Sequence, residues 1–410
     1  MIDIRELRRD SAGLLSKLAR KGAHEVGREF LAADTAWRES TTKVEGLRAS
    51  LKRSDKPTEE RVRELAARKE ALHVAQQELA VLERTRQDLL DRLPNPPADD
   101  VPDGGEDDYT VVREVGARPS FAFPVKNHSE LAEGPGWVDA ARGTKVSGSR
   151  FVYRVGHLAL VELALYRFAL QRIVDLGHVP VLPPVLVRRK AMYGTGFLPN
   201  DAINIYELER DGLYLVGTSE VPLAAFHAGE TMDELPRRYV AQSTCFRRES
   251  GAAGKDTRGM FRVHQFEKVE MFVCCLPEHS REEHDRLLAI EEEIVQTLGL
   301  PYRVINTAAA DLGAPAAKKY DIEAWFPAEQ RYREITSTSN TTDFQARRLD
   351  IRFRRDGKRE PIHMLNGTAV TARSLLAILE NFQQADGSVV IPPVLHAFGA
   401  PRLLGPRFDI

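Results

Sequence analysis

Two series of side chains spaced seven residues apart occupy roughly the first ninety positions, and they restrict the possible folds more than any other feature. Such a spacing, kept over several turns, is typical of a helix that packs along a second helix. A short polar break separates the series, where Pro57 favours the first turn of a new helix and Thr58 is an alternative cap. Two long helices joined by a short turn run antiparallel, so we expect a helical hairpin on the order of 35–50 Å long. The series are Phe30, Trp37, Val44 and Leu51, then Leu65, Leu72, Leu79 and Arg86, with Val62, Ala75, Leu82 and Leu89 interleaved in the second.

Charge is distributed unevenly along this predicted hairpin. Between residues 48 and 69, eight Lys and Arg side chains stand against four Asp and Glu, whereas the whole chain has a formal net charge of -2. A solvated coiled-coil surface with ion pairs four residues apart is one interpretation of this pattern. A basic tip on a long arm is also typical of proteins that contact the phosphates of an RNA backbone. The candidate RNA contacts are Arg48, Lys52, Arg53, Lys56 and Arg61.

A segment rich in proline, glycine and acidic residues follows the helical region. Neither a helix nor a central strand tolerates the prolines and the glycine pair of residues 94–105. We therefore predict an N-terminal helical arm at residues 1–93, a linker at residues 94–108 and a second domain at residues 109–410. The second domain alternates strand-like and helical runs.

The composition is that of an ordinary globular protein, with 42% hydrophobic and 29% charged residues among 410. The near-zero net charge provides no global basic field, so contacts with nucleic acid depend on local patches. The three cysteines, Cys245, Cys274 and Cys275, lack the spacing of a metal site or a disulfide framework, which fits a reducing compartment. No stretch approaches the ~20 apolar residues that span a bilayer. We expect no membrane segment and a cytoplasmic location.

Residues 244–271 combine cations and carboxylates with a loop of small residues. The sequence Arg-Arg-Glu at residues 247–249 leads into the loop 250–254, and a strand-like run returns through Phe266 to Met271. This pattern predicts a hairpin. Arginine side chains at its base suit the fork-like recognition of phosphate or carboxylate oxygens, although a surface ion pair is the simpler role for Arg247.

This stretch reads F-R-R-E-S-G, then D-T-R-G, then H-Q-F-x-K-V-E-M. It resembles motif 2 of the class II aminoacyl-tRNA synthetases, in the form that the seryl-specific members of this family carry. Residues 157–176, an apolar-faced helical run, precede Pro184-Val185-Leu186 and resemble motif 1. Residues 363–373, which open a further helical run, resemble motif 3. The resemblance extends from the arm to Gly387. It implies an α+β fold, in which an antiparallel coiled-coil arm precedes a catalytic domain built on a mixed, mainly antiparallel sheet flanked by helices.

The activity that this resemblance implies has two steps. L-serine reacts with ATP to give seryl-adenylate and pyrophosphate, and the serine then passes to the 3' end of tRNA(Ser), with tRNA(Sec) as an additional candidate acceptor. The resemblance also implies Mg²⁺ as cofactor and a homodimer formed through motif 1. Two alternatives stay open: a serine-activating ligase that loads a carrier protein, and a non-catalytic, synthetase-like RNA-binding protein.

The resemblance assigns ATP to motifs 2 and 3 and to residues 334–337. Arg247 would bridge the α-phosphate and the serine carboxylate, and Arg373 would hold the γ-phosphate, so these two are the implied catalytic residues. Glu249 would accept from the adenine amino group, and Phe266 would stack on the base. Hard oxygens suit Mg²⁺, and its implied ligands are Glu334 and Ser337. The remaining implied ATP contacts are Arg248, Val263, Ile335 and Thr336.

The implied serine pocket draws on three segments. Thr218 would accept from the serine ammonium, and Glu270 would be a buried carboxylate facing the ammonium and the hydroxyl. A buried carboxylate requires a partner, and a pocket with such groups rejects alanine, which would leave them unpaired. The full implied set is Thr218, Ser219, Glu220, Arg247, Glu270, Asn366 and Thr368, and the implied contacts of the tRNA acceptor end are Lys255 and Arg258.

Two departures from the family pattern stand out. The spacing between Asn366-Gly367-Thr368 and Arg373 is one residue shorter than usual, so Thr368 and Thr371 compete for one role. We prefer Thr368, because it directly follows Asn366-Gly367. Phe197 stands where many members carry glutamine. The short spacing predicts an altered pocket shape and raises the hypothesis of a specialised copy, such as one resistant to a serine-mimicking inhibitor.

Overall fold

The computed structural model describes residues 1–51, 59–250 and 260–405, and of residues 60 and 61 only the backbone. Packing divides the chain into two compact units, Met1–Pro96 and Pro97–Ile410. Within the described residues, no helix is both long and apolar enough to cross a membrane. The three cysteines are buried and carry free thiols.

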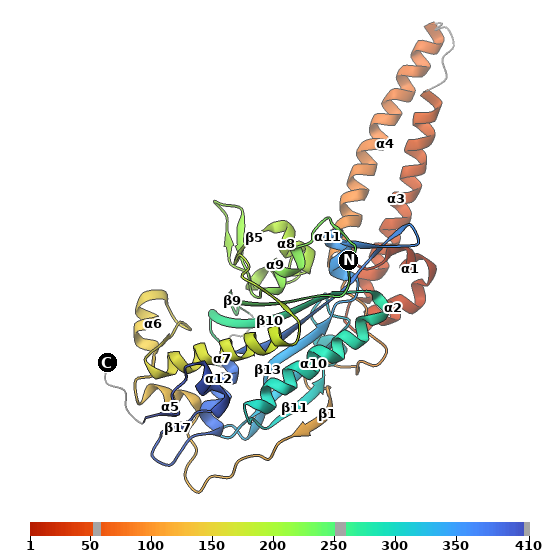
Figure 1. The fold of residues 1–410 in the computed structure, drawn as a ribbon. Helices are drawn as coiled ribbons and strands as arrows, with labels where there is room; N and C mark the ends of the chain where they lie inside the picture. The colour runs from red at the N-terminus through yellow and green to blue at the C-terminus, as the bar shows by residue number, and fades with distance from the viewer. Residues whose placement is uncertain (52–58, 251–259, 406–410) are drawn as a thin grey trace. The chain divides into compact units, whose positions relative to one another are not determined.

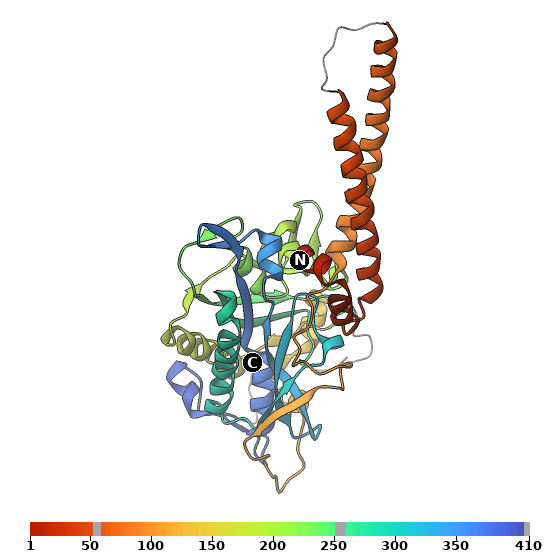
Figure 2. The same ribbon diagram turned by 90° about the vertical axis from the view of Figure 1, so that its right-hand side faces the viewer.

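The first unit is a set of helices in which two long ones run antiparallel, side by side in both views (Figures 1 and 2). This confirms the predicted helical hairpin. The carboxylates of Asp3 and Asp10 accept from backbone amides at the starts of the two short helices. The helices are α1 (Ile4–Arg9), α2 (Ser11–Ala19), α3 (His24–Leu51) and α4 (Glu59–Arg92).

The seam between α3 and α4 buries apolar side chains at the predicted spacing, among them Phe30, Val44, Ala75 and Leu89. Val62 was wrongly expected in this seam. Its side chain is 53% exposed, because it lies in the first turn of α4, where the helix pair ends.

A charged layer interrupts the apolar seam at Arg86, the last position of the second series. The Nε of Arg86 donates to the buried Asp34 Oδ1 over 2.7 Å, and its guanidinium carbon lies 4.6 Å from the Trp37 ring centroid. Arg8 of α1 donates to the other oxygen of Asp34 over 2.8 Å. Asp34 therefore links three helices of this unit. The heptad spacing did not predict this role.

The second unit is built on an eight-stranded sheet with the order β1-β11-β12-β13-β16-β10-β9-β4. The neighbours are antiparallel except for β4, which pairs with β9 in parallel. This confirms the mixed, mainly antiparallel sheet expected of a class II catalytic domain. The strands are β1 (Thr110–Val115), β4 (Val179–Val181), β9 (Arg237–Phe246), β10 (Gln265–Cys275), β11 (Tyr302–Asn306), β12 (Lys318–Phe326), β13 (Arg331–Asn340) and β16 (His363–Thr371).

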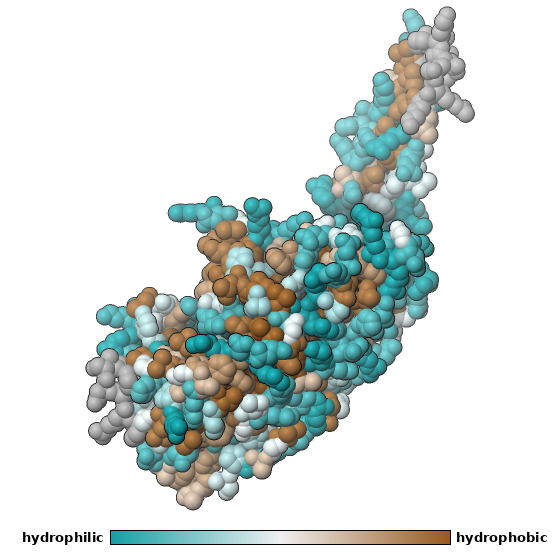
Figure 3. All heavy atoms as spheres, in the orientation of Figure 1, coloured by the Kyte–Doolittle hydropathy of each residue, from teal (hydrophilic) through white to brown (hydrophobic). Residues whose placement is uncertain are grey.

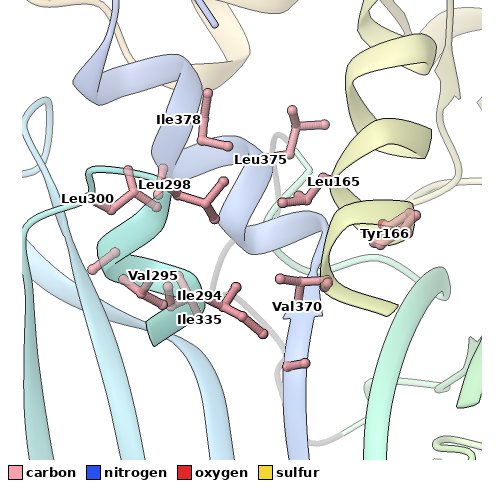
Figure 4. Packing of buried hydrophobic residues seen from close by; sticks show 14 of the residues in the cluster. Leu165, Tyr166, Ile294, Val295, Leu298, Leu300, Ile335, Val370, Leu375 and Ile378 are labelled. Carbon is pink, nitrogen blue, oxygen red and sulfur yellow. The ribbon is translucent and has the colours of Figure 1, made fainter. Parts of the chain in front are cut away.

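Three helices, α7 (His157–Asp175), α10 (Ser280–Thr297) and α12 (Ala372–Asn381), cover one face of this sheet (Figure 1). Their apolar side chains recur every three or four residues, so each presents one stripe to the strands. Figure 4 shows Leu165 of α7 and Ile294 of α10 close to Val370 of β16 in this core. Burying each such side chain contributes roughly 1.5–3 kcal/mol.

The other face of the sheet carries a smaller apolar cluster and the candidate site. Phe272 and Cys274 of β10 point into this cluster, since they alternate with Met271 and Val273 of the main core. Helices α9 (Glu220–Ala225) and α11 (Phe344–Leu349) pack on it. The remaining elements are α5 (His128–Glu133), β2 (Val138–Asp139), α6 (Ala140–Ser147), β3 (Tyr153–Arg154), β5 (Leu186–Arg188), α8 (Arg189–Thr195), β6 (Glu207–Leu208), β7 (Leu213–Leu215), β8 (Thr231–Met232), β14 (Arg352–Arg355), β15 (Lys358–Pro361), β17 (Val389–Val390) and β18 (Leu403–Leu404), with short 3-10 turns between them.

Candidate active site

A cavity of about 550 Å³ lies on the sheet face that α9 and α11 partly cover. Most of the predicted site residues line it, although they are spread over more than 150 positions of the sequence. These lining residues are Thr218, Glu220, Arg247, Glu249, Val263, Phe266, Glu270, Glu334, Ile335, Ser337, Asn366, Thr368 and Arg373.

Three predicted residues do not line the cavity. Thr336 points to the opposite side, where its hydroxyl donates to Glu291 of α10 over 3.1 Å. The guanidinium of Arg248 lies 5.2 Å from the Tyr206 ring centroid, and Ser219 is buried at the start of α9.

The predicted RNA contacts are only partly described. Arg48 is exposed in the last turn of α3, and Arg61 lies in α4 with its side chain outside the described residues. Lys52, Arg53, Lys56, Lys255 and Arg258 also lie outside them.

Strand β10 supplies the floor of the cavity through simple alternation. Phe266, Lys268 and Glu270 line the cavity, whereas Val269 and Met271 point into the main core. The partner strand β9 ends at Phe246, so Arg247 follows the strand directly. Its Nε donates to the backbone oxygen of Gly217 over 3.3 Å, a neutral partner that leaves the guanidinium charge for an anion.

Two β-bulges bring further polar groups into the cavity. On β13, Thr336 pairs with Ile322 and Glu334 pairs with Glu323, so Ile335 is the extra residue. The bulge reverses the alternation, and Glu334 and Ser337 therefore face the same side although three positions separate them. On β16, Ala369 is the extra residue between Thr368 and Val370.

The deep end of the cavity holds a compact polar network. Lys268 Nζ lies 2.6 Å from Glu270 Oε2 and donates to Thr218 Oγ1 over 2.7 Å. The Thr368 hydroxyl donates to the same oxygen of Glu270 over 2.9 Å. The Glu270 carboxylate is 1% exposed, so Lys268 and Thr368 provide the partners that a buried carboxylate needs.

Glu220 lies beside this network, and the pKa of its carboxyl group is raised. Its Oε1 accepts from the Gln345 side-chain amide over 2.7 Å. Burial, followed by the nearby charge of Glu270, raises the pKa of Glu220 to about 7. Its carboxyl group is therefore close to half-ionised near neutral pH.

Arginines also line the cavity, outside this polar network. Arg373 Nη1 lies 3.2 Å from Glu334 Oε2, and the Thr371 side chain accepts from the Arg373 backbone amide over 3.1 Å. Thr371 therefore caps helix α12, while Thr368 binds Glu270. Arg262 donates to Glu249 over 2.9 Å, and Glu249 has the uncommon left-handed backbone φ of 51°.

Glu334 and Ser337 have the chemistry that Mg²⁺ requires. Desolvation disfavours the charged form of Glu334, but Arg373 and Lys319 outweigh it, so its pKa lies below the usual value. An ionised carboxylate and a hydroxyl suit an ion that takes its other ligands from phosphates and water. Among the described residues, no group of three or more His, Cys, Asp and Glu could hold a metal by itself.

Known proteins are similar to this chain along its whole length. Residues 206–382 match the family model of the tRNA synthetase class II core domain (G, H, P, S and T). A serine–tRNA ligase of Thermobifida fusca is 48% identical over 421 aligned residues, covering 99% of this chain and 99% of that protein. The chain belongs to the serine–tRNA ligase family.

Solved structures of the serine–tRNA ligase family have the same fold. The seryl-tRNA synthetase of Pyrococcus horikoshii, solved in complex with ATP, has a TM-score of 0.92 and 39% identity, covering 98% of this chain and 99% of that one. The cytoplasmic serine–tRNA ligase of Naegleria fowleri, solved with AMP, has a TM-score of 0.84 and 32% identity, covering 95% and 94%. These matches confirm the family and the fold that the motifs predicted.

Several residues that line the cavity were not identified from the sequence, and two charged examples are Lys268 and Arg262. Lys268 stands inside the quoted F-x-K-V-E string, two positions from both Phe266 and Glu270, and that alternation was the available signal. Arg262 precedes Val263 on the returning run, and the spacing of the motif did not predict its ion pair with Glu249.

Proposed function

We propose that this chain is an active serine–tRNA ligase that forms seryl-adenylate from L-serine and ATP and then charges the 3' end of tRNA(Ser), with tRNA(Sec) as an additional acceptor. One observation carries the proposal: a single cavity joins a polar, carboxylate-floored end to an arginine-lined end. The first suits a small zwitterion with a hydroxyl, and the second suits a triphosphate.

Adenylate formation requires the serine carboxylate to attack the α-phosphorus of ATP. Arg247 binds both anions, since its planar fork reaches two neighbouring groups. Arg373 holds the γ-phosphate, and these two are the proposed catalytic residues. Positioning and charge neutralisation of this kind provide most of the acceleration in phosphoryl chemistry.

The rest of the ATP site follows from the same motifs. Phe266 stacks on the adenine, Glu249 accepts from its amino group, and Val263 lines its pocket. Ile335 completes the proposed contacts that line the cavity, and the proposed Thr336 and Arg248 flank these contacts in the sequence while their side chains point elsewhere. Glu334 and Ser337 would hold Mg²⁺, which would neutralise phosphate charge when bound.

The serine site lies at the polar end of the cavity. Glu270 accepts from the serine ammonium and hydroxyl, Thr218 accepts from the ammonium, and Glu220 supports both. Ser219, Asn366 and Thr368 complete the pocket, and Thr368 is preferred over Thr371 because it contacts Glu270. Alanine would leave these polar groups without partners, so we expect strong rejection of alanine.

The N-terminal unit is the proposed tRNA-binding arm. We assign the arm to residues 1–93, the linker to residues 94–108 and the catalytic domain to residues 109–410. The arm contacts are Arg48, Lys52, Arg53, Lys56 and Arg61, and the acceptor-end contacts are Lys255 and Arg258.

A homodimer and a cytoplasmic location complete the proposal. Several large apolar side chains of α7 and the region of β4 are exposed, among them Leu160, Leu163, Val179 and Leu182. Figure 3 shows apolar side chains gathered on the face of the second unit that bears α7. A contiguous exposed apolar patch is typical of a protein interface, and β4 is also the edge strand of the sheet.

The two alternatives are less well supported. A ligase that loads a carrier protein would use the same adenylation residues, but the 48% identity to a serine–tRNA ligase covers 99% of the chain, the arm included. Side-by-side charging of tRNA and carrier protein distinguishes these acceptors. A non-catalytic role would not require the cavity to keep Arg247, Glu270, Glu334 and Arg373 together.

Serine-dependent exchange of pyrophosphate into ATP tests the proposal directly. We expect exchange with L-serine and a much lower rate with L-alanine in the same assay. A protein sample shown to be folded and able to bind ATP, yet without serine-dependent exchange, would contradict the catalytic proposal.

A further inference from the structure

Two arginines lie close to the ring of Phe261, and one of them, Arg373, lines the cavity. The ring of Phe261 is buried, lines the cavity and follows the loop that precedes β10. The guanidinium carbon of Arg333 lies 3.4 Å from the ring centroid, and that of Arg373 lies 4.6 Å from it. Both distances fall within the ~6 Å over which an aromatic face attracts a cation.

The ring itself is held in place. The ring of Phe326 lies 5.7 Å away in an edge-to-face arrangement, with an angle of 75° between the planes. Phe261 therefore presents a fixed surface, since its own orientation is set by the core of the second unit.

Carboxylates are among the other partners of these two arginines. Arg333 donates to Glu329 over 2.7 Å, and Arg373 lies 3.2 Å from Glu334. A carboxylate holds an arginine but also offsets its charge, which weakens the attraction for phosphate. Glu334 is in addition the proposed Mg²⁺ ligand, so its oxygens are shared once metal and ATP bind. The uncharged ring of Phe261 has neither effect.

We propose that Phe261 is a positioning residue that keeps the guanidinium group of Arg373 aimed at the terminal phosphates of ATP without neutralising it, while Arg333 braces the other contacts of the ring. The inference rests on the proposed function, because it takes Arg373 to be the γ-phosphate ligand. Phe261 acts through Arg373 and makes no bond to the reacting atoms.

A pair of substitutions separates this role from simple packing. Phe261→Leu keeps an apolar side chain but removes the aromatic face, whereas Phe261→Tyr keeps the face. We expect Phe261→Leu to raise the Kd for ATP and the KM for ATP in exchange by about tenfold. In Phe261→Tyr, the Kd and the KM for ATP should stay within about twofold of the values for the unchanged protein. The KM for serine should change little in either variant.

Binding of AMP supplies the decisive comparison, because AMP lacks the terminal phosphates. Calorimetric Kd values for ATP and AMP should diverge in Phe261→Leu, with ATP weakened and AMP unchanged. Equal weakening of both nucleotides, equal behaviour of the Leu and Tyr variants, or unchanged ATP affinity in Phe261→Leu would each overturn the inference. The exchange rate of the unchanged protein tests the proposed function separately, since the nucleotide-binding comparison needs no catalysis.

Discussion

Glu220 shows how burial at a single position sets the pH response of the serine site. Its carboxyl group accepts from Gln345 and has a pKa raised to about 7, first by burial and then by Glu270. An ionised Glu220 supports the serine ammonium, whereas a protonated one does not. We expect the KM for serine in the exchange reaction to rise by up to about tenfold per pH unit below pH 7. Exchange kinetics between about pH 6 and pH 8 measure this.

Glu220→Gln provides the control, because an amide does not titrate and should flatten this profile. The stability effect has the opposite sense. Between the ordinary value of 4.5 and about 7, the folded state holds a proton that the unfolded state has lost. The contribution of Glu220 to stability is therefore full below this window and falls as pH rises through it. If the KM for serine depends on pH in the same way in Glu220→Gln as in the unchanged protein, Glu220 is not the titrating group.

Arg247 is expected to dominate adenylate formation. Arg247→Ala removes the fork that binds two anions, and we expect serine-dependent exchange to fall by about 100- to 1,000-fold. Arg247→Lys should recover only part of this loss, because a point charge does not bridge two groups in the same way. Arg281→Ala is the matched control, since that side chain is 84% exposed on α10. Near-normal exchange by Arg247→Ala would refute the assigned role.

At the residue scale, the sequence identified many of the charged residues of the site but fewer of the ion pairs that they form. Arg247, Glu270 and Arg373 were identified from motif strings, and the structure places them around one cavity. Lys268, the charged partner of Glu270, was not identified, because a lysine in a strand is ordinarily solvated. Only the alternation of β10 turns Lys268 inward.

At the scale of elements, the strands were predictable but their irregularities were not. A regular β13 would put Glu334 on the same side as Thr336, facing α10. The bulge at Ile335 turns it to the cavity, and a second bulge at Ala369 lies within the short spacing between Thr368 and Arg373. A bulge adds one residue without any distinctive side chain, so the pattern of polar and apolar residues carried no sign of it.

Gly367 marks where β16 lies tightly against α10. A Cβ at this position would stand 2.7 Å from Glu291 Oε1 and 3.2 Å from Thr338 Oγ1. Glu291 is fully buried and is held by Thr336, so it has little room to move. We expect Gly367→Ala to lower the free energy of unfolding by about 1–3 kcal/mol. The KM for serine should also rise, since Asn366 and Thr368 flank the substitution.

A double-mutant cycle with Glu291→Ala tests this cause. Urea unfolding of the four proteins should show a smaller cost of Gly367→Ala when Glu291 is already truncated, because the close contact has gone. Additive costs would mean that Glu291 is not what resists the extra methyl group.

At the scale of the whole molecule, the long helices and the main sheet follow from the sequence because their periodicity extends over many residues. The small sheets of two and three strands have no such signal, since two or three residues are too few to show an alternation. The charged layer around Asp34 was invisible for a related reason: a heptad pattern predicts apolar seam positions, and Asp34 departs from it.

The division into two units leads to a prediction about the two chemical steps. Each unit has its own buried core, and every residue of the proposed adenylation site lies in the second unit. Replacing residues 30–90 by a short flexible linker should therefore abolish tRNA charging and leave serine-dependent exchange within about threefold of the full chain. Loss of both activities would mean that the arm is needed for folding, which a melting curve of the shortened protein reveals. Arg48→Glu in the intact arm is the matched variant: it should raise the KM for tRNA and reduce the salt dependence of binding by about one phosphate contact, with exchange unaffected.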